Sequence, residues 1–326
     1  MSQRKIICTI GPVTNTPDKL RELAAAGMNV ARLNGSHSDL DWHASTIAML
    51  KDVLPTIPIL LDIPGRKIRT TALKIEPIFK AGDTITLTTD TSHDGSEKVP
   101  VNYGDLHRDL EVGHTILADD GTLRFIVTAV VGVDIVCRAD VDGQLKSRKG
   151  INVPHVSLRT QVMTKRDQAM IEFAKTHGVD YIGISFVESA EHVAAVRSAI
   201  NGKSPRIVSK VENLGGLTNV AEIADASDAL MIDRGDLSVE TNLEDVTLNQ
   251  KRIIEVARNS GKPVIVATEL LHTMIENRFP TKAEVSDITN AVLDGCAATM
   301  LSGETAIGKY HIEAVQLMRQ ISDSAN

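Results

Sequence analysis

Charged side chains follow several short apolar runs of this 326-residue chain, in positions where they could act together. Lys210 and Glu212 close one such run, Asp233 and Asp236 follow the next, and Thr268 follows a third. One polar residue after a strand is commonly a solvated terminus or half of a structural ion pair. Several in succession are harder to explain that way. Carboxylates are hard oxygen ligands suited to Mg²⁺ or Mn²⁺, so Glu212 and Asp236 are the predicted metal ligands.

Cations occupy comparable positions. Arg32, Arg69 and Lys210 could neutralise a phosphoryl group in transfer, a reaction in which catalysis is mostly positioning and electrostatics. Gly235, between Arg234 and Asp236, exposes backbone N–H groups that could bind a carboxylate. Together these residues predict a small phosphorylated carboxylate substrate, bound through a divalent ion.

Eight short β-rich apolar runs alternate with amphipathic stretches, and they define the elements that must position these groups. The predicted strands are residues 5–9, 29–33, 58–62, 181–186, 206–210, 229–232, 263–267 and 298–301. Thr16 before Pro17, and Thr281 with Glu284, are typical helix starts. Eight strands alternating with helices predict a closed (β/α)8 TIM barrel, in which catalytic groups collect at the carboxyl ends of the strands.

One connection lacks the helical period. Between Thr70 and Thr164 the sequence has short segments alternating at period two, punctuated by glycines, which predicts a small antiparallel β domain. Two chain crossings would join it to the barrel after the third strand, so we expect a hinged lid. The predicted division is a barrel of residues 1–70 and 151–326 with an inserted lid of residues 71–150.

Composition narrows the class of protein. A hydrophobic content of 42% allows one large domain and a smaller one, and a net charge of −7 argues against a nucleic-acid partner. The odd, widely spaced cysteines, Cys8, Cys137 and Cys296, favour a reducing compartment. Neither a signal peptide nor an apolar run that could span a bilayer is recognisable, so we expect a cytoplasmic protein without a membrane partner.

Longer motifs resemble those of the pyruvate kinase family. They are CTIGP at residues 8–12, GMNVARLN at 27–34, SKVEN at 209–213, RGDL at 234–237, PTKAEVSD at 280–287 and MLSGETA at 300–306. The resemblance covers nearly the whole chain in register. It implies a (β/α)8 barrel of the phosphoenolpyruvate/pyruvate type with an inserted small β-barrel lid.

The resemblance also implies an activity. The expected enzyme is a glycolytic kinase that moves a phosphoryl group between ADP/ATP and phosphoenolpyruvate, or a related enol of an α-keto acid, with Mg²⁺. Glu212 and Asp236 would hold the metal, Lys210 would stabilise the phosphoryl group, and Arg32 would bind phosphate. Thr268 would lie beside the enolate carbon where a proton is delivered.

Further positions carry over from the family. Asn34, Ser36 and Asp62 match its monovalent-cation ligands. The residues expected to face the nucleotide are His37, Lys149, Asp119, Asp120 and Trp42, together with Asn34. Trp42 has an equally good interpretation as a helix residue that packs on a neighbour.

The monovalent cation itself is not expected. Members that need K⁺ carry Thr and Glu where this chain has Ile63 and Lys67, and this pair resembles the K⁺-independent branch. The Lys67 ammonium could supply the charge that K⁺ otherwise brings. The alternative is that Lys67 is a solvated lysine and Asn34, Ser36 and Asp62 still coordinate K⁺.

The chain departs from the family pattern at several positions. Gly35 replaces a phenylalanine, Glu188 an arginine and Ser238 a glycine, changes that neutral drift could explain. Ile307 replaces a lysine, which removes a positive charge. Asp233 replaces a small residue and would repel a substrate carboxylate. We therefore expect Asp233 to turn away, or to meet an amine, a hydroxyl or a second metal.

The family's C-terminal regulatory domain has no counterpart here, so we expect a homodimer formed through barrel or lid surfaces. Two other functions stay open: a metal-dependent lyase or hydrolase using the same enolate site, and a non-catalytic relative. Asp119, Asp120 and Lys149 in the lid favour the kinase, since they have no evident use without a nucleotide.

Overall fold

In the computed structural model, which describes residues 3–156, 158–159 and 162–325, eight parallel strands close into a barrel. They are β1 (Lys5–Thr9), β2 (Val30–Asn34), β3 (Ile59–Ile63), β13 (Tyr181–Ile184), β14 (Arg206–Val211), β15 (Ala229–Asp233), β16 (Val264–Ala267) and β17 (Ala298–Leu301). Each strand pairs with the next along the chain, and β1 pairs with β17 to close the ring. All eight predicted barrel strands are confirmed, with ends that differ by at most two residues.

Two apolar layers hold the barrel together. Inside it, side chains such as Val208, Met231 and Met300 are buried against one another. Between the strands and the outer helices lies a larger buried cluster that includes Leu61 and Ile232. Strands that are covered on both faces have continuous apolar sequences, and this pattern is why they could be predicted from the sequence.

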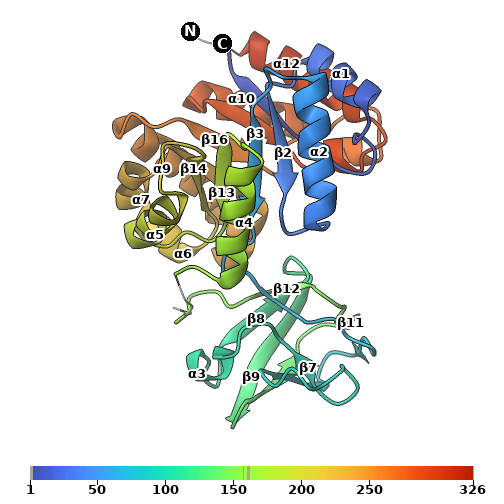
Figure 1. The fold of residues 1–326 in the computed structure, drawn as a ribbon. Helices are drawn as coiled ribbons and strands as arrows, with labels where there is room; N and C mark the ends of the chain where they lie inside the picture. Colours follow the sequence, from blue (N-terminus) through green and yellow to red (C-terminus); the bar gives the residue numbers. More distant parts are fainter. Residues whose placement is uncertain (1–2, 157, 160–161, 326) are drawn as a thin grey trace.

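Helices surround the barrel (Figure 1). They are α1 (Pro17–Ala26), α2 (Leu40–Val53), α4 (Lys165–Thr176), α5 (Ala190–Ile200), α6 (Leu214–Thr218), α7 (Val220–Ala226), α8 (Arg234–Glu240), α9 (Val246–Asn259), α10 (Lys282–Asp294), α11 (Gly303–Ala306) and α12 (His311–Ser324), with 3₁₀ turns η1 (Leu243–Asp245) and η2 (His272–Ile275). The predicted caps are confirmed: Thr16 caps α1 ahead of Pro17, and Thr281 with Glu284 forms a capping box on α10.

A second sheet lies at one end of the barrel (Figure 1). In spatial order its strands are β4 (Ile68–Arg69), β12 (Gly150–Asn152), β8 (Thr115–Ala118), β9 (Leu123–Val131), β10 (Asp134–Ala139), β6 (Thr84–Thr88) and β7 (Val99–Pro100). The short pair β5 (Ile78–Phe79) and β11 (Gly143–Gln144) and helix α3 (Leu106–Asp109) accompany it. Its pairings are antiparallel as predicted, except for the parallel pair β6–β7.

The second sheet curls towards closure and has its own core. An isolated bridge between Thr70 and Val101 joins the ends of the edge strands β4 and β7. Phe125 and Ile135 are fully buried within it. Lid and barrel therefore have separate cores, and the chain crosses between them after β3 and before α4.

Two smaller sequence expectations concern cysteines and membranes. The three cysteines are free and buried, without a disulfide. Among the described residues no helix combines the length and the apolar character needed to cross a bilayer.

Candidate active site

The carboxyl ends of β14 and β15 bring a buried lysine and two carboxylates together. Lys210 Nζ lies 2.7 Å from Glu212 Oε1 and 3.1 Å from Asp233 Oδ2. It also donates to Ser185 Oγ at 3.2 Å, and Asp62 Oδ2 is 3.6 Å away. Burial makes these contacts strong, since little water screens them. Lys210 thus faces three carboxylates at once.

Arg32 reaches the same region from β2. Its guanidinium donates to Asp62 Oδ2 through Nε at 3.0 Å and Nη2 at 2.6 Å, and Nη1 donates to Thr9 Oγ1 at 3.1 Å. Arg32 and Asp62 are both buried. The pair fixes the orientation of the guanidinium and also occupies the Asp62 carboxylate.

Lys67 extends the cluster from the lid side. Its Nζ lies 2.5 Å from Asp236 Oδ1 and 5.6 Å from the centroid of the Phe186 ring. The side chains of Lys67 and Asp236 are both mostly buried. Lys67 is therefore a mostly buried cation of the site and not a solvated surface lysine.

Three carboxylates could hold a divalent ion. Oxygen atoms of Glu212, Asp233 and Asp236 all lie within 4.8 Å of one another. Carboxylate oxygens from adjacent strand ends are the donor set that Mg²⁺ and Mn²⁺ prefer, so the residues present fit such an ion. The sequence predicted Glu212 and Asp236 as the metal ligands, and left Asp233 either turned away or facing an amine, a hydroxyl or a second metal.

The two carboxylates beside Lys210 have pKa values shifted in opposite directions. Burial raises the pKa of Glu212 to about 8, against the opposing Lys210 ammonium. Burial also disfavours the Asp233 anion, but Lys210 and Arg32 outweigh it and lower the pKa of Asp233 to about 2. Nearby Glu212, Asp233 and Asp62 raise the pKa of Lys210 in spite of its burial. Lys210 and Asp233 are hence charged at neutral pH.

The Arg-Gly-Asp run opens the short helix α8 and packs on the end of β16. Arg234 is buried and donates to the Thr268 carbonyl and to Asp287 Oδ2. The Gly235 N–H donates to Thr268 Oγ1 at 2.9 Å, and that hydroxyl donates to the Ala267 carbonyl at 2.7 Å. The Gly235 N–H predicted to be unobstructed therefore already has a partner in Thr268.

Thr268 also has an uncommon backbone. Its φ of +66° is a left-handed conformation that a β-branched residue rarely adopts. Such residues cost on the order of 1–3 kcal/mol and cluster at active sites and ligand clamps. The hydroxyl of Thr268 is thus held at a fixed position between β16 and α8.

A cavity of about 410 Å³ opens from this cluster towards the lid. Its lining includes most of the predicted polar residues, from both barrel and lid. They are Arg32, Asn34, Ser36, His37, Lys67, Arg69, Asp120, Lys149, Lys210, Glu212, Asp233 and Asp236. Ser147, Arg148, Ser185 and Phe186 also line it and had not been predicted as site residues.

Some predicted site residues do not line the cavity, among them Asp62, Asp119, Gly235 and Thr268. Lys149 Nζ is paired with Asp119 Oδ1 at 2.6 Å, so Asp119 reaches the cavity only through Lys149. Asp62 is engaged by Arg32, while Asn34 Oδ1 accepts the Ser36 N–H at 3.1 Å. Of the three predicted K⁺ ligands, only Asn34 and Ser36 line the cavity.

Trp42 packs against the protein and does not line the cavity. Its ring meets His43 edge-on at 5.1 Å between centroids, and it lies against the barrel core. These contacts favour the packing interpretation over an adenine contact.

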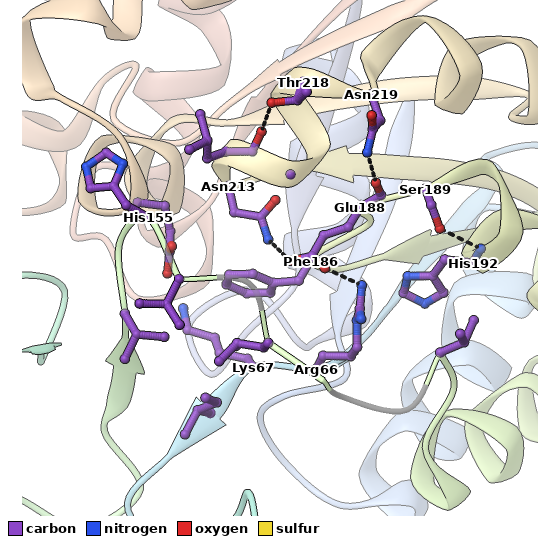
Figure 2. A pocket seen from close by; sticks show the side chains of 18 of the residues that line it. Arg66, Lys67, His155, Phe186, Glu188, Ser189, His192, Asn213, Thr218 and Asn219 are labelled. Carbon is purple, nitrogen blue, oxygen red and sulfur yellow. Dashed lines mark hydrogen bonds and ion pairs between the residues drawn. The ribbon is translucent and has the colours of Figure 1, made fainter. Parts of the chain in front are cut away.

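A second cavity of about 510 Å³ lies on the other side of Lys67 and Phe186, which line both spaces. Figure 2 shows the Phe186 ring projecting into it, with Lys67 and Arg66 below. Glu188 accepts from Arg66 at 2.9 Å and from Asn213 Nδ2 at 2.8 Å. Glu188, at a position where the family pattern has an arginine, thus has Arg66 as a cationic partner.

The other departures have local explanations. A Cβ on Gly35 would lie 2.2 Å from Met170 Cε and 2.3 Å from the Asp62 carbonyl, so no phenylalanine fits there. Ser238 Oγ donates to the Gly235 carbonyl at 2.8 Å inside α8. Ile307 is 59% exposed, and nothing in the structure explains it.

The chain is similar to known proteins along its whole length. A family model described as the barrel domain of pyruvate kinase matches residues 1–315. The pyruvate kinase of Geobacillus stearothermophilus is 42% identical over 328 residues, which cover 98% of this chain and 56% of that protein. The pyruvate kinase of Clostridium perfringens is 40% identical over 334 residues, which cover 100% of this chain and 70% of that protein. The pyruvate kinase of Thermococcus litoralis is 41% identical over 325 residues, which cover 98% of this chain and 68% of that protein. The chain thus spans between about half and two thirds of the length of these relatives.

Proposed function

Because this chain belongs to the pyruvate kinase family, we propose that it is a Mg²⁺-dependent phosphotransferase working between ADP/ATP and phosphoenolpyruvate, or a closely related enol of an α-keto acid. The observation that carries the proposal is the buried Lys210, which meets carboxylates of adjacent strand ends at the floor of a cavity shared by barrel and lid. Phosphoryl transfer needs such an arrangement of fixed cations and metal-binding oxygens.

The cations of the cavity have separate tasks. Lys210 stabilises the phosphoryl group during transfer, and its buried position lets one charge act strongly. Arg32 binds phosphate in an orientation fixed by Asp62, and Arg69 adds a second guanidinium from β4. These groups are in place before the substrate arrives, which lowers the cost of reorganisation.

Thr268 is the residue that delivers a proton to the enolate carbon. Its hydroxyl is already held by Gly235 N–H and the Ala267 carbonyl, on a strained backbone. A fixed donor at this strand end agrees with the general position of catalytic groups in such barrels. The Gly235 N–H orients the Thr268 hydroxyl and is thus already engaged, so it is not left free for a substrate carboxylate.

Glu212 and Asp236 hold the divalent ion, Mg²⁺ or Mn²⁺. When bound, the ion supplies positive charge to the phosphoryl oxygens in transfer. Lys67 then shares Asp236 with the ion, and Lys210 shares Glu212 with it. The pKa of Glu212 predicts that ion binding releases a proton near neutral pH, because a ligating carboxylate must be ionised.

The nucleotide occupies the lid side of the cavity. His37, Asp120 and Lys149 line it, and Asp119 orients Lys149. A lyase or hydrolase would leave Asp119, Asp120 and Lys149 of the lid without a ligand, so they favour the kinase. Family membership further supports a place in glycolysis. We also propose a cytoplasmic location and a homodimeric assembly. The mostly buried Lys67 beside Asp236 supports a reaction without K⁺.

The experiment is a coupled assay that measures pyruvate formed from phosphoenolpyruvate and ADP. We expect turnover with Mg²⁺ and none with a chelator. Lys210→Met should lower kcat by about 100-fold or more, as expected for losing a charge that acts on the transition state. Asp236→Ala should abolish turnover while leaving the circular dichroism spectrum unchanged, since Asp236 lies outside the packed core. A wild type that forms no pyruvate above the Lys210→Met background would overturn the proposal.

A further inference from the structure

Asp233 is a buried carboxylate with no ordinary structural task. It stands at the N-cap position of α8, where an aspartate normally accepts a hydrogen bond from the first turn of the helix. Its side chain makes no such bond. Instead Asp233 Oδ2 lies 3.1 Å from Lys210 Nζ, and the residue is only 6% exposed. Capping therefore does not account for it.

The strand register directs Asp233 at the metal site. Val211 of β14 is paired with Ile232 of β15, so Glu212 and Asp233 occupy the next position on the two parallel strands. Residues paired in this way project to the same face of a sheet. Asp236 follows one helical turn after Asp233, and oxygens of these three residues lie within 4.8 Å of one another.

A bound ion requires ionised carboxylates, and the fully ionised cluster carries one negative charge in excess. Its four carboxylates are Asp62, Glu212, Asp233 and Asp236, and its three cations are Arg32, Lys67 and Lys210. If position 233 were uncharged, the two signs would be equal in that state. Asp233 thus adds a negative charge in a buried place, where an uncompensated charge is costly. A divalent ion would relieve it and leave a net positive site for a phosphorylated ligand.

From the position of Asp233, the charge excess and the absent cap we propose that Asp233 is a third protein ligand of the divalent ion. This rests on the proposed metal site at Glu212 and Asp236. An octahedral ion with three carboxylate ligands keeps three positions for water and substrate, where two ligands would leave four. The charge of Asp233 is then directed at the ion, which removes the repulsion expected between Asp233 and a substrate carboxylate.

The test measures Mn²⁺ binding to the wild-type chain without substrate, from the electron paramagnetic resonance signal of free Mn²⁺. Asp233→Ala should weaken binding at least about tenfold, and the isosteric Asp233→Asn should also weaken it. Asp18→Asn is the matched control, because it makes the same chemical change on an exposed side chain of α1 and should leave binding unchanged.

The number of bound waters gives an independent readout. Line broadening by ¹⁷O-water should count three waters on Mn²⁺ in the wild type and four in Asp233→Ala. Unchanged affinity in both Asp233 variants, or four waters in the wild type, would overturn the third ligand and leave the proposed site intact. A wild type that does not bind Mn²⁺ would overturn the proposed metal site as well.

Discussion

Lys67 is the side chain that we propose makes the reaction independent of K⁺. Its ammonium lies 2.5 Å from Asp236 and lines the same cavity as Asn34 and Ser36. Under the proposal that this fixed charge replaces a monovalent cation, we predict equal activity in tetramethylammonium chloride and in KCl at equal ionic strength.

Reversing the charge tests the same residue. Lys67→Glu should lose activity in tetramethylammonium chloride and regain it in KCl, since a carboxylate makes the pocket attractive to K⁺. Lys19→Glu, on the exposed face of α1, is the matched control and should behave as the wild type does. A wild type that is inactive without K⁺ contradicts the account.

Gly35 is a second position where one residue decides the local packing. Gly35→Ala would place its Cβ 2.2 Å from Met170 Cε and 2.3 Å from the Asp62 carbonyl, and the backbone carbonyl cannot yield. We predict a loss of about 1–3 kcal/mol in the free energy of unfolding, measured in urea, as for other overpacked sites. Gly104→Ala, with nothing within 4 Å of its Cβ, should change that free energy by less than about 0.5 kcal/mol. Equal urea midpoints for Gly35→Ala and the wild type would refute the packing argument.

The sequence predicted the members of the cavity better than their partners. Lys210, Glu212, Asp236 and Arg32 were predicted as site residues because each lies at the end of a predicted strand or within a few residues of it. Lys67 could not be assigned to Asp236, because these residues are 169 positions apart and meet only through the crossing into the lid. Asp233 was recognised as unusual, but its direction depends on the pairing of β14 with β15.

At the scale of elements, one contact links the lid sheet to the barrel through α8. Asn152 Nδ2 of β12 donates to Glu240 Oε1 at 2.6 Å. Burial, helped by Asp236 and Glu188, raises the pKa of Glu240 to about 7 although Asn152 opposes it. Between pH 4.5 and about 7, Glu240 is ionised in the unfolded chain and still protonated in the folded chain. Glu240 therefore costs stability as the pH rises from about 4.5 to about 7.

Glu240→Gln should remove this cost and keep an oxygen that accepts from Asn152. We predict that the variant exceeds the wild type by roughly 1–3 kcal/mol in the free energy of unfolding at pH 8, and matches it near pH 4. Glu172→Gln, at an exposed position of α4, is the control and should give no such pH-dependent difference. A Glu240→Gln effect of the same size at both pH values would show that ionisation is not its cause.

The barrel strands could be predicted from their continuous apolar runs, whereas the shortest strands of the lid could not be predicted. Each barrel strand has four to six residues, nearly all buried, so its apolar run is continuous. Strands of two residues, such as β4 and β7, are too short to show alternation. Their existence depends on partners distant in sequence, as when Gly150 pairs with Arg69.

At the scale of the whole molecule, the barrel leaves large apolar side chains in contact with solvent. Phe279, Leu293 and Ile307 are all more than half exposed. Exposed apolar groups of this kind favour association, and twofold dimers are its commonest form. We predict a mass of two chains by light scattering at micromolar concentration, and a mass of one chain would contradict the proposed homodimer.

The central claim is that a divalent ion at the carboxyl ends of β14 and β15 is the centre of the chemistry. It is tested most directly by anomalous scattering at the manganese edge from crystals soaked in Mn²⁺. We predict one strong peak about 2 Å from carboxylate oxygens of both Glu212 and Asp236, as in Mg²⁺–oxygen bonds. If Glu212 and Asp236 kept only Lys210 and Lys67 as partners, with no peak between them, the account would be contradicted.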